Sequence, residues 1–193
     1  MTKGRETRAR VLDSAIALFN RKGFGNTSIQ DIIDATGVKK GNLYFHFASK
    51  DDLCLSLLRE AGDRFFKYLS KSIKSPDPLG KIGDILHAVL NYHRRMRFSG
   101  GCIFGNTALE KSDTNEKYAA FIRTVFTQWE QIFAGLLREA REQGELSSKI
   151  APDTMARHIV AVMEGSIMMA RLYKREDPIV EGIGYLNNLI GVP

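Results

Sequence analysis

Apolar side chains recur at steps of three and four residues along almost the whole chain, and this spacing constrains the fold most. Leu12, Ala15, Ile16 and Phe19 show it in its simplest form, because residues at these steps share one face of an α-helix. No segment shows the strict alternation of a half-buried strand. With 44% apolar residues among 193, the chain can build a packed core. We therefore expect an all-α protein of eight or nine helices.

Breakers and capping residues set the bounds of these helices. Glycine at 23 and the pair Ser75–Pro76 are typical of helix ends, whereas Ser or Thr with a polar residue three positions later is typical of helix starts. The second helix has two such starts, Thr27 with Gln30 and Ser28 with Asp31. The expected helices are 6–22, one from 27 or 28, one that contains 43–47, then 49 to about 75, 78–97, 102–111, 116–143, 152–174 and 179–189.

The stretch 27–50 predicts two short helices joined by a tight turn at Gly37. Leu43 and Phe47 form the inner face of the second short helix. Its other faces carry polar or aromatic side chains, among them Lys39, Lys40, Asn42, Tyr44 and His46. This is the size and chemistry of a helix-turn-helix, whose second helix enters the major groove of DNA.

The positive charge of the chain is concentrated in its first quarter. Residues 1–50 hold nine Lys and Arg against four Asp and Glu, which accounts for +5 of the total net charge of +6. A duplex favours this arrangement, because each phosphate that a cation neutralises releases counterions. A solvated basic arm would have the same composition, but the coincidence with the helix-turn-helix pattern favours double-stranded DNA as the partner.

The two long helices 116–143 and 152–174 carry extensive apolar surface. The second is apolar around most of its circumference and has small residues at Ala156, Ala161, Gly165 and Ala170. A helix that is buried on several sides needs several neighbours. We expect a second copy of the chain to supply them, in a homodimer with a two-fold four-helix interface through these two helices. The alternative is a well-buried core pair within one chain.

Several classes of protein are excluded. The longest apolar runs are interrupted by Glu164 or by glycine and are too short to cross a bilayer. The N-terminus is charged and Asp13 interrupts its apolar stretch, unlike a signal peptide. We therefore expect a cytoplasmic protein with no membrane segment.

Cys54 and Cys102 are far apart and lack a metal-type spacing, so we interpret them as reduced thiols, with a redox switch as the alternative.

One run of features resembles the N-terminal domain of the TetR family of transcriptional regulators. An amphipathic helix ends at Gly23–Phe24, and TSIQDI, GVKKGNLYFHF and SKDDL follow in that order within about residues 6–60. GCIFGN at 101–106 and the pair Glu164–Gly165 resemble one branch of the family. The resemblance implies a homodimer with two DNA-binding heads on a pseudo-palindromic operator, and a small-molecule pocket in a helical C-terminal domain. Most members repress transcription when free of ligand.

The helix-turn-helix supplies the candidate DNA contacts. Lys40 and Asn42 are the first candidates for base readout, with Gln30 reaching from the preceding helix. Lys39 stands where the family often has Ser, so the recognition helix that contains 43–47 lacks that N-cap. Contact of Lys39 with a DNA phosphate or a guanine edge would offset the loss, and an exposed, tolerated substitution is the alternative. The other candidates are Gly41 for close backbone approach, Tyr44, His46 and Lys50 for phosphates, and Phe45, which either faces outward or packs on the first helix.

Polar or aromatic side chains on otherwise apolar helix faces are the candidate effector contacts. Glu164 is the most informative, because an unpaired buried carboxylate is costly and must therefore pair, meet a ligand or stay protonated. The aromatic and Met candidates favour an apolar or aromatic small organic effector. The candidates are His87, Asn91, His93, Cys102, Phe104, Asn106, Phe126, Trp129, Met163, Glu164 and Met168, and for each of them ordinary core or surface is the alternative.

The chain has no recognisable enzyme motif. Neither a phosphate loop nor G-x-S-x-G nor H-E-x-x-H occurs, and the four His show no metal-ligand spacing. We expect no cofactor, no metal and no catalysis, with an all-helical enzyme or an interaction protein without effector as alternatives. We divide the chain into a DNA-binding domain, 1–50, and a ligand-binding and dimerisation domain, 51–193. The helix that starts at Ser49 is expected to carry movement between them.

Overall fold

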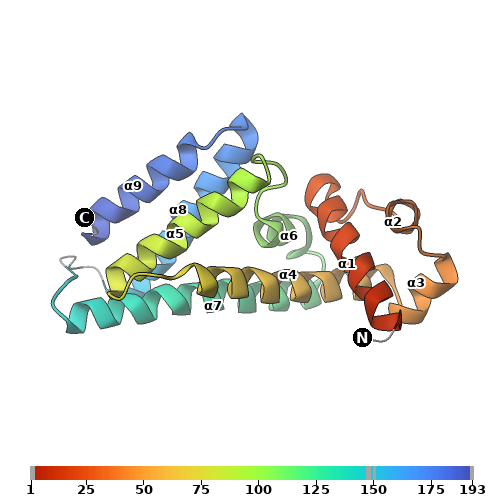
Figure 1. The fold of residues 1–193 in the computed structure, drawn as a ribbon, viewed down its shortest axis with the longest axis horizontal. Helices are drawn as coiled ribbons and strands as arrows, with labels where there is room; N and C mark the ends of the chain where they lie inside the picture. Colours follow the sequence, from red (N-terminus) through yellow and green to blue (C-terminus); the bar gives the residue numbers. More distant parts are fainter. Residues whose placement is uncertain (1–2, 147–148, 150, 192–193) are drawn as a thin grey trace. The chain divides into compact units, whose positions relative to one another are not determined.

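The computed structural model describes residues 3–146, 149 and 151–191, and all secondary structure within these ranges is helical (Figure 1). The expected all-α class is confirmed. None of the described helices combines the length and hydropathy that a membrane span requires. In the described ranges the helices are α1 (Lys3–Lys22), α2 (Ile29–Thr36), α3 (Lys40–His46), α4 (Lys50–Ser72), α5 (Pro78–Arg95), α6 (Ile103–Lys111), α7 (Glu116–Glu142), α8 (Pro152–Tyr173) and α9 (Asp177–Ile190).

The predicted helix bounds mostly agree with these, but α1 begins at Lys3 rather than at 6, and α4 ends earlier than predicted. The sequence predicts that this helix continues to Ser75, whereas it ends at Ser72. Asp84 of α5 is the reason, because its Oδ2 accepts the backbone N–H groups of Lys74 at 2.6 Å and Ser75 at 2.7 Å. Amides that donate to a neighbouring carboxylate no longer donate to the preceding helical turn, so the helix stops.

The chain forms two compact units. The first contains the residues up to Phe65 together with Ile103–Ala120, and the second contains Phe66–Cys102 together with the residues from Phe121 onward. Both α4 and α7 contribute residues to each unit. α6 belongs to the first unit, although it follows α5 of the second unit along the chain.

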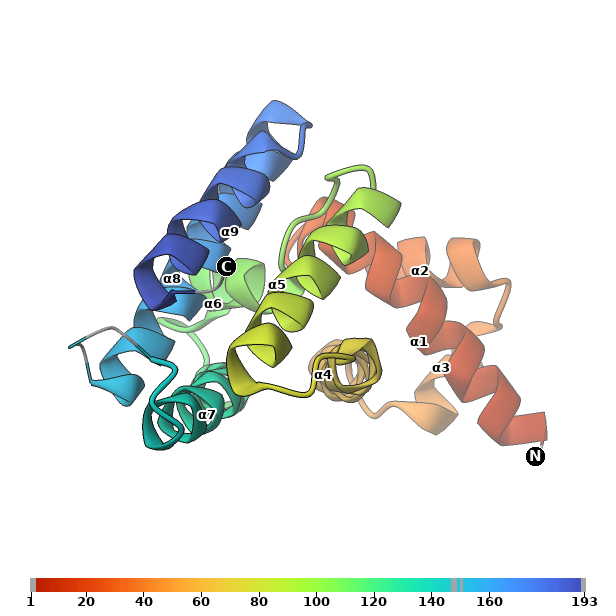
Figure 2. The same ribbon diagram turned by 60° about the vertical axis from the view of Figure 1, so that its left-hand side comes forward.

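The core of the first unit is built on the apolar face of α1, which lies against α2 in both views (Figures 1 and 2). Leu43 and Phe47, the predicted inner residues of the third helix, are buried. The stacked rings of Phe19 and Phe24, whose centroids are 4.6 Å apart, close the end of α1. Other buried side chains of this core are Val11, Leu12, Ala15, Ile32, Leu53, Leu57 and Leu58.

In the second unit α8 and α9 lie side by side (Figure 2). Gly182 of α9 allows this close approach, because a Cβ at this position would lie 2.3 Å from Ser166 Oγ of α8. The inner faces of the two helices are apolar and buried, with Met155, Ile159, Met163, Ile167 and Ala170 on α8 and Ile179, Ile183 and Leu186 on α9. α9 also packs on α5, so only part of the surface of the two helices is left to solvent or to a partner.

Candidate DNA-binding head and effector site

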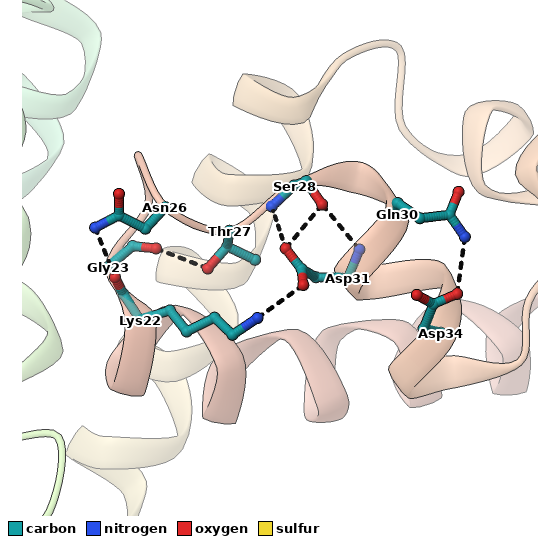
Figure 3. A network of polar contacts seen from close by, with 8 residues as sticks. All are labelled: Lys22, Gly23, Asn26, Thr27, Ser28, Gln30, Asp31 and Asp34. Atoms are coloured by element: carbon teal, nitrogen blue, oxygen red, sulfur yellow. Dashed lines mark hydrogen bonds and ion pairs between the residues drawn. The ribbon is translucent and has the colours of Figure 1, made fainter.

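A capping box fixes the start of α2 (Figure 3). Ser28 Oγ accepts the backbone N–H of Asp31 at 3.0 Å, and Asp31 Oδ2 accepts the backbone N–H of Ser28 at 2.7 Å. Of the two predicted starts, Ser28 with Asp31 is therefore the one that forms. Lys22 Nζ of α1 lies 2.7 Å from Asp31 Oδ1. The hydrogen bonds from Lys22 and Ser28 hold the pKa of Asp31 well below its usual range.

Thr27, the alternative cap, has a different role. Its side chain is fully buried, and its Oγ1 donates to the carbonyl of Gly23 at 2.7 Å (Figure 3). Asn26 Nδ2 donates to the carbonyl of Lys22 at 3.3 Å. Both bonds satisfy carbonyl groups at the C-terminal end of α1, which a helix leaves without partners. The turn between α1 and α2 is therefore connected to both helices by side-chain hydrogen bonds.

Gly37 makes the sharp turn between α2 and α3. Its φ of +65° is left-handed, and its N–H donates to the carbonyl of Ile33 at 2.8 Å. Glycine adopts this conformation without the steric cost that a side chain brings. Lys39 is the N-cap of α3 and makes no side-chain capping hydrogen bond. As expected, α3 therefore lacks a side-chain N-cap. The side chain of Lys39 is exposed.

The outer surface of α3 presents the residues that the sequence singled out. Lys40, Gly41 and Asn42 are exposed at the start of the helix. Phe45 is 83% exposed and so faces outward rather than against α1. The residue that α1 contacts is instead Phe47, whose ring centroid is 5.3 Å from the Arg8 guanidinium.

The remaining predicted DNA contacts surround this surface. Tyr44 is exposed, and the half-buried His46 meets the ring of Phe45 edge-on with centroids 5.2 Å apart. Gln30 is exposed on α2, but its Nε2 donates to Asp34 Oδ1 at 2.8 Å (Figure 3). Lys50 is half-buried at the first position of α4.

Two hydrogen bonds confirm that Ser49 starts α4. Ser49 Oγ accepts the backbone N–H of Asp52 at 3.1 Å, and Asp52 Oδ2 accepts the backbone N–H of Ala48 at 3.0 Å. This is nearly the reciprocal arrangement of a capping box. The path of the chain from α3 into α4 is therefore fixed by side chains.

Glu110 is a contact residue of the first unit that no pattern in the sequence indicates. Glu110 of α6 accepts backbone N–H groups from Phe24 and Gly25, in the turn that precedes α2. These residues are separated by 86 and 85 positions, so no local spacing pattern connects them.

Among the effector candidates, the structure brings Cys102 and Glu164 together. The Cys102 thiol hydrogen-bonds the Glu164 carboxyl, while burial raises the pKa of Glu164 to about 7. Glu164 Oε1 is buried and has no hydrogen-bond partner among the described residues. A neutral thiol does not balance the charge of a carboxylate, so a proton on Glu164 or a ligand beside it remains open.

The other effector candidates are more dispersed. Met163 and Trp129 are buried in the second unit, where the rings of Trp129 and Phe126 stack with centroids 6.4 Å apart. Burial of His93 lowers its pKa to about 4. His87, Asn91 and Met168 are exposed. The last two candidates belong to the first unit. The ring centroids of Phe104 and Phe65 are 6.4 Å apart, and Asn106 Nδ2 donates to Asn20 Oδ1 at 3.2 Å.

α8 and α9 also leave large apolar side chains in solvent. Leu172 is 66% exposed, and Met168, Tyr173, Val180 and Tyr185 are exposed as well. A groove of about 520 Å³ between the two helices is lined partly by the small residues Ala161, Gly165, Ser166 and Gly182. No large apolar residue on the described part of α7 is exposed to this degree.

Comparison with protein families gives two matches that together cover most of the chain. Residues 11–57 match the family model for bacterial regulatory proteins of the tetR family, and residues 78–184 match the tetracyclin repressor-like C-terminal domain. The first match contains the helix-turn-helix, and the second extends from the start of α5 into α9.

Curated relatives match over most of their length. The HTH-type transcriptional repressor DhaR from Mycobacterium sp. (strain GP1) is 26% identical over 179 residues, which cover 89% of this chain and 86% of the relative. The transcriptional regulator AcuR from Cereibacter sphaeroides is 30% identical over 171 residues, which cover 88% and 78%.

A solved structure agrees with the fold. The TetR transcriptional regulator from Chloroflexus aurantiacus J-10-FL is 33% identical and superposes with a TM-score of 0.92, over 100% of this chain and 98% of that one. Together with the two domain matches and the geometry of α2 and α3, this similarity shows that the chain belongs to the TetR family of DNA-binding transcriptional regulators.

Proposed function

We propose that this protein is a homodimeric repressor that binds an inverted-repeat operator and is released by a small organic effector. Residues 1–50, the head, bind DNA, and residues 51–193 bind the effector and the second copy. The observation that carries the proposal is the outer surface of α3, where Lys39, Lys40 and Asn42 are exposed while Leu43 is buried. A regulator of bacterial chromosomal DNA acts in the cytoplasm.

Base readout falls to the exposed residues at the start of α3. Lys40 suits guanine, whose O6 and N7 accept hydrogen bonds, and Asn42 suits adenine, to which it can make two hydrogen bonds. Gly41 lies between them and has no side chain, so that the backbone can approach the groove closely. Lys39 precedes them and offers a further cation to the DNA. Gln30 contributes only after exchanging its hydrogen bond to Asp34 for one to a base.

The residues around this centre position the head on the sugar–phosphate backbone. Tyr44, His46 and Lys50 offer a hydroxyl, an imidazole and an ammonium group, which suit phosphate oxygens. Such contacts fix the register of the protein without reading sequence. Phe45 has no polar atom to offer a phosphate, and an exposed ring in the major groove suits the 5-methyl group of thymine.

The second copy docks on the apolar face of α8 and α9. Exposed apolar patches of this kind mark interaction surfaces, and a two-fold interface needs a self-complementary patch. Tyr173 and Tyr185 line a groove together with Gly165 and Gly182, so large side chains and a hollow occur on one surface. The exposed Leu172 directly precedes Tyr173. The interface therefore keeps the predicted α8 and replaces α7 with α9.

The effector site includes the neighbourhood of Glu164 and Cys102. Glu164 Oε1 lacks a partner and can accept a hydrogen bond from an effector, while the neighbouring Met163 is buried and apolar. Phe126 and Trp129 belong to the same unit and are the aromatic side chains proposed to suit an apolar or aromatic body. Pockets of small ligands combine such apolar walls with a few polar groups.

Release requires that the effector binds one conformation more tightly than the other. Two recognition helices fit successive major grooves when they lie about 34–36 Å apart. An effector that prefers a dimer with a different separation therefore lowers operator affinity, and α4, which starts beside the head at Ser49, is the element proposed to carry that movement.

The test is selection from a random duplex pool with purified parent protein, Lys40→Ala and Asn42→Ala. We expect the parent to enrich an inverted repeat. Lys40→Ala weakens binding to all duplexes and flattens the dependence on salt, because one cation near the DNA is lost, and it also relaxes preference at the base pair that Lys40 reads. Asn42→Ala relaxes preference at one or two base pairs, at about 1–3 kcal/mol each. An unchanged preference in Asn42→Ala refutes its readout role, and turnover of a bound molecule would favour a helical enzyme instead.

A further inference from the structure

We infer that Glu110 of α6 is a positioning residue of the DNA-binding head, because its carboxylate holds the turn between α1 and α2. This inference rests on the proposed function only in assuming that the head reads DNA. Glu110 lies outside residues 1–50 and outside every set of DNA or effector contacts described above.

The two oxygens of Glu110 serve two consecutive amides. Oε2 accepts the backbone N–H of Phe24 at 2.9 Å, and Oε1 accepts the backbone N–H of Gly25. Hydrogen bonds from backbone amides to a carboxylate are stronger than those between neutral groups. The carboxylate therefore bridges two neighbouring peptide units and fixes the local path of the turn.

The turn is shaped to receive this carboxylate. A Cβ at Gly23 would lie 3.0 Å from Glu110 Oε2, and a Cβ at Gly25 would lie 3.0 Å from Oε1. Gly23 also has a φ of +82°, a conformation that side chains disfavour. The glycines on either side of Phe24 thus leave room for the approach of Glu110.

A second contact from the same face of α6 reinforces the first. Asn106, one helical turn before Glu110, donates to Asn20 Oδ1 of α1 at 3.2 Å. Residues four apart lie above one another on a helix, so α6 contacts the end of α1 through Asn106 and the following turn through Glu110. Thr107, between them on this face, is fully buried.

The position of this turn determines the position of α2. Only two residues separate Gly25 from Ser28, the N-cap of α2. Both of them hydrogen-bond back to the end of α1, Asn26 to the carbonyl of Lys22 and Thr27 to the carbonyl of Gly23. α2 in turn leads through Gly37 to α3. Loss of the Glu110 contact therefore loosens the connection that sets how α3 is presented.

α6 is well placed for such a role because of where it lies in the sequence. It falls inside the segment that matches the C-terminal regulatory domain, yet it packs on α1 in the first compact unit. Cys102, a candidate effector contact, immediately precedes α6. Glu110 is thus a direct contact between the regulatory part of the sequence and the DNA-binding head.

The test compares amide exchange and DNA binding in full-length Glu110→Ala, Glu110→Gln and Asp113→Asn. Asp113 is an exposed carboxylate three positions further along, so Asp113→Asn controls for the removal of one negative charge from the same part of the chain. Hydrogen exchange by NMR reports the amides of Phe24 and Gly25, and fluorescence anisotropy reports affinity for the selected duplex and for a scrambled one.

We expect exchange at both amides to be about tenfold faster or more in Glu110→Ala, and the ratio of selected to scrambled affinity to fall by about tenfold. Glu110→Gln retains one acceptor oxygen and should give a smaller change of both quantities, while Asp113→Asn should leave both as in the parent. If Glu110→Ala impairs folding, the milder Glu110→Gln still decides between these outcomes.

Unchanged exchange at Phe24 and Gly25 in Glu110→Gln and Glu110→Ala would overturn the contact itself. Faster exchange with an unchanged affinity ratio would overturn the positioning role. If the parent does not distinguish the two duplexes, the proposed function fails instead, and the exchange measurements still test the contact.

Discussion

Two surfaces of this protein leave aromatic side chains in water, and their surroundings differ. On α3, Phe45 and Tyr44 lie among Lys39, Lys40 and Asn42. On α8 and α9, the exposed Tyr173 and Tyr185 line a groove together with two glycines and other small residues. The charged side chains at this groove are of both signs, Arg175 beside the Tyr173 ring and Asp177 with Glu181. The first surface suits a polyanion that presents both charge and methyl groups, and the second suits an apolar, protein-like partner. Exposure alone does not identify a partner, but exposure together with its surroundings does.

A charge placed on the apolar surface of α8 should have the largest effect, because it should separate the two copies of the chain. Leu172→Asp puts a carboxylate into the proposed interface, where burial without a partner is costly. We expect the mass in light scattering to fall to that of one chain, and affinity for the inverted repeat to fall by about a hundredfold or more, because two linked heads bind far more tightly than one.

Leu109→Asp is the matched control for that experiment. Leu109 is 88% exposed on α6, away from α8 and α9 along the chain, so its charge should leave the mass unchanged. If Leu172→Asp also keeps the mass of the parent, the second copy docks elsewhere.

A smaller effect tests the aromatic side chain on α3. If Phe45 contacts thymine methyl groups, replacing thymine by deoxyuridine in the selected operator removes the contact without changing any hydrogen bond. We expect the parent to lose about 1 kcal/mol for the substituted position, and Phe45→Ala to bind both duplexes equally. Anisotropy titration measures both differences, and an equal loss in the parent and in Phe45→Ala would show that Phe45 does not read the methyl group.

The last prediction concerns the interior of the second unit and acts on stability rather than on DNA affinity. Burial raises the pKa of Glu164 to about 7 from its ordinary 4.5, so the folded protein holds this proton more tightly than the unfolded chain. Stability is therefore lost as the pH rises from about 4.5 through about 7. Glu164→Gln stays neutral, and we expect it to be more stable than the parent by roughly 1–3 kcal/mol at about pH 8, with a much smaller difference at about pH 5.

Chemical denaturation at the two pH values measures that difference. Glu181→Gln on α9 is the control, because Glu181 is exposed and its replacement should show no comparable dependence on pH. A difference between Glu164→Gln and the parent that does not grow with pH would mean that Glu164 is charged in the folded protein and has a partner.

The sequence predicts those features that depend on local spacing. The all-α class follows from apolar periodicity, and the starts of α2 and α4 follow from Ser28 with Asp31 and Ser49 with Asp52. An early end to α4 could not be predicted, because it depends on Asp84, nine to ten positions further along. Local rules carry no information about such an acceptor.

The candidate site likewise has features that local spacing predicts and features that depend on distant parts of the chain. That the polar residues of α3 lie opposite Leu43 and Phe47 follows from helical spacing, whereas the orientation of Phe45 stayed open because it depends on the path of α1. The contacts of Glu110 bridge 86 positions and had no signal at all. Exposure of Tyr185 on α9 likewise depends on which face α8 covers.

The number of chains on the selected operator, and the response of affinity to the spacing of its half-sites, decide whether the protein reads DNA as a two-headed dimer. We predict two chains per duplex by mass, and a large loss of affinity when about 5 bp, half a helical turn, are inserted between the half-sites, because the two copies of α3 then face different sides of the duplex. One chain per duplex, or an affinity that does not change with the insertion, would contradict a two-headed dimer that reads successive major grooves.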